Sequence, residues 1–189
     1  KNVKKLLFVK LKGNTMSIQI KAIHNQIDIN LPNEPFKIWG QMIPSLENGK
    51  WDYTIKRFEQ TSTQCFPNEN YDYDDNAIYL GAYEGEKCIG LAILQKDMFK
   101  YLYLDDLKVN SAYRKHGIGS KLIAACMNEA KKRKMQGIYT IGQDNNLSAC
   151  LFYLKNGFEI GGFNNRNYRG TPQENKSDIY FYKDCDANA

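Results

Sequence analysis

The segment Tyr101–Met135 most constrains what this chain can fold into. It begins with the nine residues YLYLDDLKV, which are typical of a β-strand, and it ends in a long amphipathic helix. The loop between them contains Arg114-Lys115-His116-Gly117-Ile118-Gly119. A strand that leads through glycines into a helix N-terminus presents free backbone N–H groups and the positive end of the helix dipole. The segment therefore predicts an anion-binding site.

Three known phosphate-binding loops compete for this segment. The P-loop requires Lys directly after its second glycine, whereas Lys121 follows Gly119 by two residues. The dinucleotide-binding fingerprint requires a third glycine three residues after Gly119, and that position is Leu122. The pattern that fits is Arg/Gln-x-x-Gly-x-Gly/Ala, which residues 114–119 satisfy. This pattern resembles the acetyl-CoA pyrophosphate loop of the GNAT acetyltransferase superfamily.

A second motif follows about one strand later in the sequence. Residues 144–158 read DNNLSACLFYLKNGF, which resembles the second GNAT signature, Asn-x-x-Ala-x-x-Phe/Leu-Tyr-x-x-x-Gly-Phe. The matching residues are Asn146, Ala149, Phe152, Tyr153, Gly157 and Phe158. Because two independent motifs occur in the order that the fold requires, the chain is identified as a member of the GNAT superfamily.

Within the superfamily the chain most resembles streptothricin acetyltransferases, which acetylate the β-lysine portion of that antibiotic. The similar residues are Glu34-Pro35-Phe36, Gly40, Ile43-Pro44, Trp51, the acidic segment Asn70–Asn76 and Gln143–Asn146. This resemblance implies transfer of an acetyl group from acetyl-CoA to a primary amine of a small polycationic antibiotic, by direct attack in a ternary complex. Two alternatives stay open, namely acetylation of a protein or peptide amine and a regulatory module that binds acetyl-CoA without turnover.

The order of the predicted elements indicates a mixed α/β sheet. Strands are expected over residues 18–22, 36–43, 51–58, 77–83, 88–94 and 101–109, with the turn-rich residues 44–49 after the second strand. The helix that follows has Ile118, Leu122, Cys126 and Ala130 at four-residue spacing on one face. A strand over 138–142, a helix capped by Asn145 or Asn146 and strands over 158–163 and 178–182 complete the order. The GNAT resemblance implies a mostly antiparallel twisted sheet, splayed in the middle, with helices on both faces.

Length and composition narrow the class of protein. With 189 residues we expect a single GNAT domain over residues 16–189 and a mobile N-terminal extension over residues 1–15. The net charge of +5 is mild and no apolar run approaches the about 20 residues that span a bilayer, so neither a nucleic acid nor a membrane is an expected partner. The five cysteines lack metal or disulfide spacing, which favours a cytoplasmic protein without a metal site. Whether the protein forms a homodimer stays open.

The resemblance also implies which residues bind acetyl-CoA. The pyrophosphate is expected on the loop and the helix N-terminus, from Arg114, Lys115, His116, Gly117, Ile118, Gly119 and Ser120. The pantetheine arm should pair like an added strand with the backbone of Leu107, Lys108 and Val109, where a bulge leaves the strand edge free. A backbone N–H group there should polarise the thioester carbonyl. Asn146, Ala149, Phe152 and Tyr153 complete the expected contacts, and for Asn146 a helix N-cap role stays equally open.

Acetyl transfer to an ammonium group requires proton donors and acceptors in the site. Tyr153 occupies the family's general-acid position, and the alternative is that it only packs against the cofactor. Asp105 and Asp106 lie on the strand beside the expected thioester and are candidate bases, directly or through water. The alternative is that both only bind substrate. Adjacent strand residues point to opposite faces, so only one is expected to face the site unless a bulge intervenes.

A polycationic acceptor should be attracted by the acidic segment over residues 66–76. Asp72, Asp74 and Asp75 supply carboxylates there, and Tyr71 and Tyr73 offer aromatic faces for cation–π contacts. The alternative interpretation is an acidic loop that is merely solvated.

Overall fold

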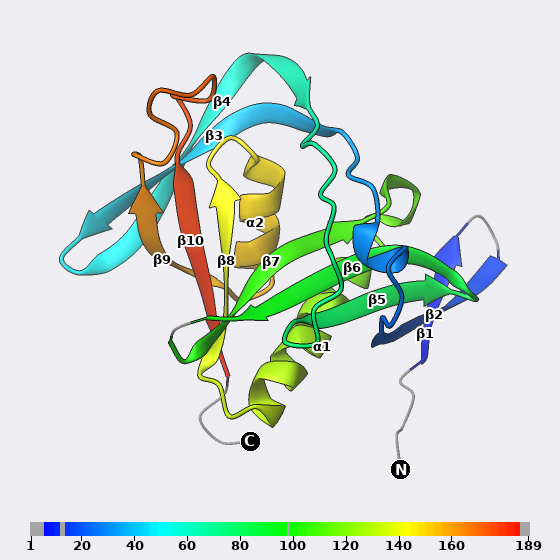
Figure 1. The fold of residues 1–189 in the computed structure, drawn as a ribbon. Coiled ribbons are helices and arrows are strands. Elements are labelled where there is room, and N and C mark those ends of the chain that lie inside the picture. Colours follow the sequence, from blue (N-terminus) through cyan, green and yellow to red (C-terminus); the bar gives the residue numbers. More distant parts are fainter. Residues whose placement is uncertain (1–5, 12–13, 98, 186–189) are drawn as a thin grey trace.

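The computed structural model describes residues 6–11, 14–97 and 99–185, and within them the chain forms an eight-stranded sheet, a separate two-stranded sheet and two α-helices (Figure 1). The strands of the large sheet lie in the order β1 (Leu6–Leu11), β2 (Asn14–Ala22), β5 (Ile78–Glu84), β6 (Lys87–Lys96), β7 (Tyr101–Val109), β8 (Gly137–Gln143), β10 (Asp178–Asp184) and β9 (Glu159–Asn164). The smaller sheet consists of β3 (Phe36–Glu47) and β4 (Lys50–Gln64). The helices are α1 (Ile118–Lys132) and α2 (Leu147–Lys155), with the short 3-10 helices η1 (Asp28–Asn30) and η2 (Ser111–Tyr113).

The large sheet opens between β7 and β8. Its strands pair antiparallel, apart from β7 and β8, which run parallel. These two strands pair only where residues 101–103 lie opposite residues 137–139, and then they separate. The predicted sheet, which is mixed, mostly antiparallel and splayed in the middle, is therefore confirmed.

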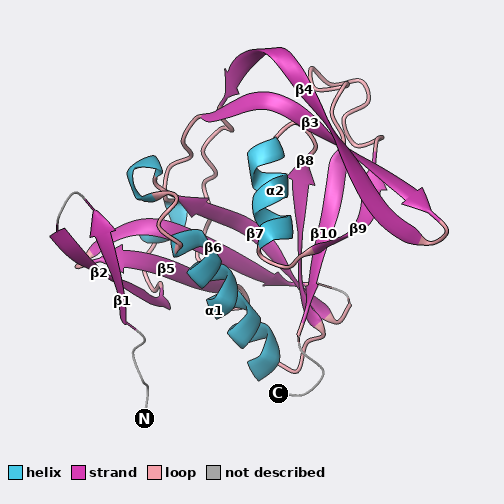
Figure 2. Cartoon of the chain, turned by 180° about the vertical axis from the view of Figure 1, so that it is seen from behind, coloured by secondary structure: helices cyan, strands magenta, loops and turns pink. Residues whose placement is uncertain are grey.

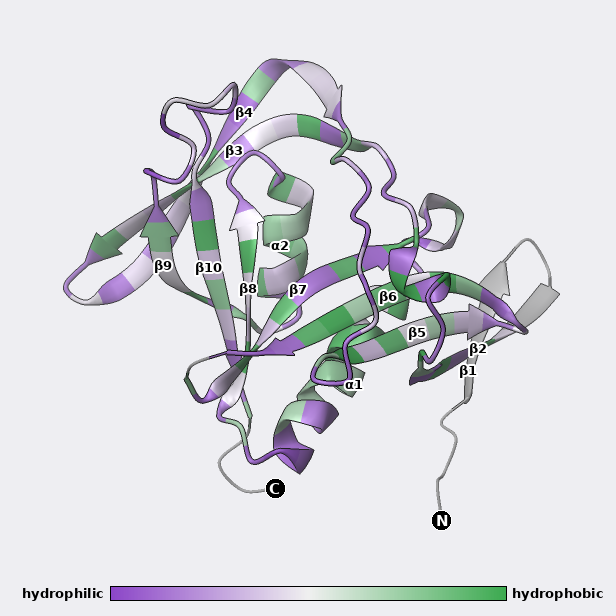
Figure 3. Ribbon diagram, in the orientation of Figure 1, coloured by the Kyte–Doolittle hydropathy of each residue, from purple (hydrophilic) through white to green (hydrophobic). Residues whose placement is uncertain are grey.

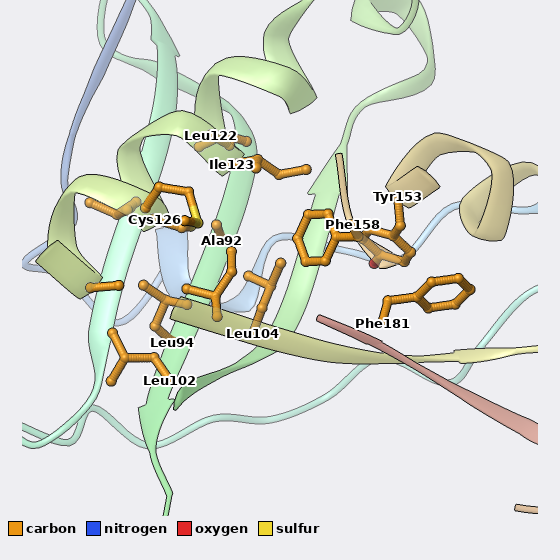
Figure 4. Packing of buried hydrophobic residues seen from close by; sticks show 14 of the residues in the cluster. Ala92, Leu94, Leu102, Leu104, Leu122, Ile123, Cys126, Tyr153, Phe158 and Phe181 are labelled. Carbon is orange, nitrogen blue, oxygen red and sulfur yellow. The ribbon is translucent and has the colours of Figure 1, made fainter. Parts of the chain in front are cut away.

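Both α-helices pack against the same face of this sheet. Leu122 of α1 and Tyr153 of α2 belong to one apolar cluster, and Figure 2 shows both helices on the near side of the sheet (see also Figure 4). A smaller cluster on the opposite face is covered by η1, which contributes Ile29. Helices therefore cover both faces as predicted, but both α-helices lie on one face and the short 3-10 helix η1 lies on the other. The reason is register: Leu102 pairs with Ile138, so the apolar side chains of β7 and β8 point to one side and attract both helices there.

β3 and β4 form a long hairpin that arches over α2 (Figure 1). Its turn consists of Asn48 and Gly49, with φ values of 51° and 76°, and Asn-Gly is the pair that favours a two-residue hairpin turn. The sequence predicted a longer turn over residues 44–49, but β3 continues through Pro44. Proline is tolerated at this position because a strand of a two-stranded sheet has a free edge.

The predicted N-terminal extension, residues 1–15, lies partly outside the described residues. Within it, Leu6–Leu11 forms β1 and pairs antiparallel with β2, where no strand was predicted. The other predicted strands and both helices are present, although β2, β3 and β4 are longer than predicted.

Candidate active site

The loop between β7 and α1 has the backbone shape of an anion cradle. Gly117 directly precedes α1 with a φ of 77°, a left-handed conformation that strains any residue with a Cβ atom. Gly119 lies against the ring of Phe152 on α2. A Cβ atom added at Gly119 would lie only 2.9 Å from Phe152 Cζ, so a larger residue would not fit. The two sequence motifs therefore meet at the N-terminus of α1. Of the other predicted loop residues, Ile118 is buried, His116 is half-buried, and Lys115 and Ser120 are exposed.

Arg114 is held by the protein itself. Its Nε donates to the Val109 carbonyl oxygen at 2.8 Å, and its Nη2 lies 3.0 Å from Glu34 Oε2. The Glu34 carboxylate also accepts a hydrogen bond from the Ser111 N–H group. The sequence predicted Arg114 as a charge partner of the pyrophosphate. In the structure its guanidinium connects the loop to the end of β7 and to Glu34, contacts that sequence reasoning missed, and the contact with the pyrophosphate stays a prediction.

The edge of β7 that faces β8 is open along the predicted pantetheine site. Leu107 and Val109 pair with β6 on one side. On the other side, in the described part of the chain, no strand pairs with β7 beyond residue 103. Where the strands separate, the Thr140 hydroxyl group donates to the Leu104 carbonyl oxygen at 2.9 Å. An open strand edge of this kind is suited to pair with an extended chain.

A β-bulge in β7 brings two adjacent carboxylates to the same site. Ile93 of β6 pairs with Asp106, whereas the next residue, Leu94, pairs with Leu104, so Asp105 is the extra residue of the bulge. Two residues of a bulged strand oppose one residue of its partner, which interrupts the alternation of side chains. The sequence left open whether one or both carboxylates would face the site; the bulge removes the reason to expect only one, and their place in the acceptor site stays a prediction.

The two carboxylates have different partners. Asp105 accepts a hydrogen bond from Gln95 Nε2 at 2.7 Å, whereas Asp106 Oδ2 lies 2.7 Å from Lys108 Nζ. Burial raises the pKa of Asp106 to about 6, and the positive charge of Lys108 opposes this rise. Burial also raises the pKa of Asp105, and the negative charge of Glu69 adds to that effect. Carboxyl groups with a pKa shifted towards neutrality are typical of functional sites.

Tyr153 lies on the buried side of α2, close to the point where β7 and β8 separate. Its ring packs against Phe158 and Phe181, with centroid distances of 5.4 and 5.5 Å (Figure 4). Burial raises the pKa of its phenol to about 12, and a hydrogen bond with the Thr140 hydroxyl group partly offsets this rise. The phenol is therefore protonated at neutral pH and available as a donor.

Asn146 caps the N-terminus of α2. Its side-chain oxygen accepts a hydrogen bond from the Ala149 N–H group at 3.4 Å. The N-cap role that the sequence left open is confirmed, while contacts of Asn146 and Ala149 with a cofactor stay predictions.

The acidic loop, residues 66–76, connects β4 to β5 and crosses one face of the large sheet (Figure 3). A hollow of about 240 Å³ lies beneath it and is lined by residues that include Tyr71, Asp72, Asp74, Tyr79 and Gln95. Tyr73 stacks on Tyr79 with 5.1 Å between the ring centroids and is 42% exposed. Asp75 is exposed and does not line the hollow. Because Gln95 also donates to Asp105, the hollow and the bulge are neighbours.

Sequence reasoning missed Gln95, Tyr103 and Thr140 as parts of the site. Tyr103 forms a hydrogen bond with Asp105, and Gln95 lies opposite Tyr103 in the ladder of β6 and β7. Strand alternation indicates which face each side chain takes, but only the pairing of β6 with β7 places Gln95 beside Asp105.

No group of side chains suited to hold a metal ion occurs among the described residues. Across residues 6–11, 14–97 and 99–185, neither helix has the length and apolar character needed to cross a membrane.

Comparison with known proteins adds four similarities. Residues 43–158 match the Acetyltransferase (GNAT) family. The chain is 34% identical to streptothricin acetyltransferase A of Bacillus subtilis (strain 168), over 86% of this chain and 97% of the relative. A crystal structure of a proposed streptothricin acetyltransferase from Bacillus anthracis, in complex with acetyl coenzyme A, superposes with a TM-score of 0.81 at 29% identity and covers 89% of this chain and 100% of that one. Nourseothricin acetyltransferase shares the fold, with a TM-score of 0.76 at 17% identity over 89% of this chain and 98% of that chain.

Proposed function

The chain belongs to the acetyltransferase (GNAT) family, and we propose that it transfers the acetyl group of acetyl-CoA to a primary amine of a small polycationic antibiotic. The first candidate acceptor is the β-lysine amine of streptothricin. The observation that carries this proposal is the pair of carboxylates at the bulge, Asp105 and Asp106, beside a hollow that two further aspartates line. A concentration of negative charge around a hollow attracts a small molecule with several ammonium groups. The similarity to a streptothricin acetyltransferase over most of both chains supports the same acceptor.

The residues present fit acetyl-CoA as the acetyl donor. The N–H groups of the glycine loop and the N-terminus of α1 suit its pyrophosphate, and exposed Lys115 adds positive charge there. The open edge of β7 suits the extended pantetheine arm. A backbone N–H group of Leu107, Lys108 or Val109 would then stabilise the oxyanion that develops on the thioester carbonyl.

In the proposed reaction Asp106 is the base and Asp105 binds the acceptor ammonium. The Asp106 carboxylate takes a proton from the ammonium, and the neutral amine attacks the carbonyl carbon to form the C–N bond. As the C–S bond breaks, the sulfur takes a proton from Tyr153, and the nitrogen loses its second proton to solvent. Exchange with solvent then returns the proton to Tyr153 and removes the one on Asp106, so that each turnover releases one proton. A base with a pKa of about 6 is suited to this step because it is ionised at neutral pH and still accepts a proton. We place the reaction in the cytoplasm, as the spacing of the cysteines favours.

A CoA-release assay across streptothricin, aminoglycosides, polyamines and peptides tests the proposal. We expect turnover with streptothricin at a higher kcat/KM than with the other amines. Turnover with peptides alone would replace the antibiotic by a protein acceptor. Tight binding of acetyl-CoA without turnover on any amine would leave a regulatory module.

A further inference from the structure

Lys108 is an unusually well-partnered lysine for a strand residue beside an open edge. Its side chain is 11% exposed, and its ammonium nitrogen lies 2.7 Å from Asp106 Oδ2, 3.0 Å from Glu69 Oε2 and 3.0 Å from Asn33 Oδ1. The contacts with Glu69 and Asn33 are hydrogen bonds that the ammonium donates, and the contact with Asp106 is an ion pair. The sequence predicted only backbone contacts with the cofactor for Lys108, but its side chain contacts the carboxylates of Asp106 and Glu69.

The three oxygens come from three separate segments. Asp106 belongs to β7, Glu69 to the acidic loop, and Asn33 to the segment before β3. Asn33 also donates to Glu69 and to the Pro67 carbonyl oxygen, the latter at 2.7 Å. The ammonium of Lys108 therefore joins the strand that carries the proposed base to the loop that lines the hollow.

We propose that Lys108 is a positioning residue of the acceptor site, whose ammonium orients the Asp106 carboxylate and ties the acidic loop to β7. This inference rests on the proposed function, because it assigns Lys108 a role in the same amine-acceptor site. Breaking a buried ion pair by removing one partner leaves an uncompensated charge, so the loss of Lys108 should disturb Asp106 directly. It should also separate Glu69, and with it the acidic loop, from β7, since the side-chain hydrogen bonds that Glu69 then keeps come from Asn33.

The charged and titratable groups around Asp106 determine the sign of the expected pH effect. They are Asp105 and Lys108 from β7, Glu69 and Tyr71 from the acidic loop, and Tyr153 from α2. In this set Lys108 is the cation, and it favours the ionised form of Asp106. Its removal should therefore raise the pKa of Asp106, and the acidic limb of the pH profile should move to higher pH.

The test compares Lys108→Met with Lys108→Arg, which keeps the charge, and with Lys56→Met on exposed β4 as the matched control. In Lys108→Met we expect the acidic limb of kcat/KM to move up by about 1 pH unit or more. We also expect faster hydrogen exchange in residues 66–76. Lys108→Arg should restore the limb, and Lys56→Met should resemble the unaltered protein in both measurements.

A purely structural role would lower activity at every pH without moving the limb, and that result overturns the proposal. Unchanged exchange in residues 66–76 overturns the tie to the loop. If Lys108→Met does not fold, the variant Glu69→Gln is measured in its place. Unchanged hydrogen exchange in residues 66–76 of that variant also overturns the tie to the loop. Failure of the proposed function is a separate outcome, because hydrogen exchange and a carbon-13 NMR titration of Asp106 report on Lys108 even if no amine is acetylated.

Discussion

Burial shifts Asp106 and Tyr153 in the same direction, with opposite consequences for their chemistry. Water stabilises a carboxylate and a phenolate, so removing water raises the pKa of both groups. For Asp106 the pKa rises to about 6, which turns a weak base into a useful one near neutral pH. For Tyr153 it rises to about 12, so the phenol stays protonated at neutral pH, as an ordinary phenol does, but becomes a weaker acid.

The first prediction concerns the pH dependence of the reaction. Asp106 must be ionised to accept a proton, so kcat/KM should fall about tenfold per pH unit below a pH of about 6 and level off above it. Asp106→Asn should abolish this limb and lower kcat/KM by about 10²-fold or more. Asp105→Asn is the matched variant, and it should keep the limb while raising KM for the amine. An acidic limb that survives in Asp106→Asn and disappears in Asp105→Asn would exchange the two roles.

The second prediction concerns Tyr153. Tyr153→Phe should lower kcat by about 10²-fold, since the leaving thiolate loses its proton donor, while the Kd for acetyl-CoA stays nearly constant. Tyr182→Phe removes a half-buried hydroxyl group on β10 and serves as the control. Stopped-flow turnover and equilibrium binding of acetyl-CoA measure the two quantities. An unchanged kcat would remove Tyr153 from the proton transfer.

At the scale of single elements, the glycine loop between β7 and α1 is where backbone conformation matters most. Gly117 has a φ of 77°, and a Cβ atom added there would contact nothing within 4 Å, so conformation alone requires glycine. Gly85, in the turn between β5 and β6, is the same case with a φ of 59°. Substitutions at these two positions cause similar backbone strain, but only the one at Gly117 lies in the proposed anion site, so comparing them distinguishes the two effects.

The third prediction uses this pair of glycines. Gly117→Ala and Gly85→Ala should each destabilise the fold by about 1–2 kcal/mol, because alanine is strained in the left-handed region. Only Gly117→Ala should raise KM for acetyl-CoA, since it distorts the N–H groups at the start of α1. Thermal unfolding and steady-state kinetics measure the two effects. Equal values of KM in both variants would argue against the loop as the pyrophosphate site.

At the scale of the whole molecule, the charge of the acidic loop is opposite in sign to the net charge of the chain. The chain carries a net charge of +5, yet Glu69, Asp72, Asp74 and Asp75 gather in the acidic loop beside the bulge. The strand with the open edge, β7, leads into the positive loop before α1, and Lys108 of β7 forms an ion pair with Glu69 of the negative loop. An anionic donor and a cationic acceptor can therefore approach one strand from oppositely charged regions.

The fourth prediction tests this field. Replacing Asp72, Asp74 and Asp75 together with Asn should raise KM for a polycationic acceptor, and the effect should shrink at high salt, because the Debye length is only about 10 Å at 0.1 M. Replacing the exposed residues Glu47, Glu59 and Glu86 with Gln changes the net charge equally and is the control. Steady-state kinetics at two salt concentrations make the comparison. An equal rise in KM for both triple variants would mean that only total charge matters.

The sequence by itself determined the class of fold, the order of the strands and α-helices from β2 onwards and the two motifs, because periodicity, capping residues and glycines act locally. It also identified the candidate residues Asp105, Asp106 and Tyr153. Only the tertiary structure decided how these candidates combine, because a bulge has no signal in one strand and exists only against the register of its partner. The same holds for the side chain of Lys108, whose partners lie 75 and 39 residues away in the sequence and meet it only after the sheet has formed. The raised pKa of Asp106 is also a tertiary effect, because burial depends on every element packed around the carboxyl group and outweighs the opposing charge of Lys108.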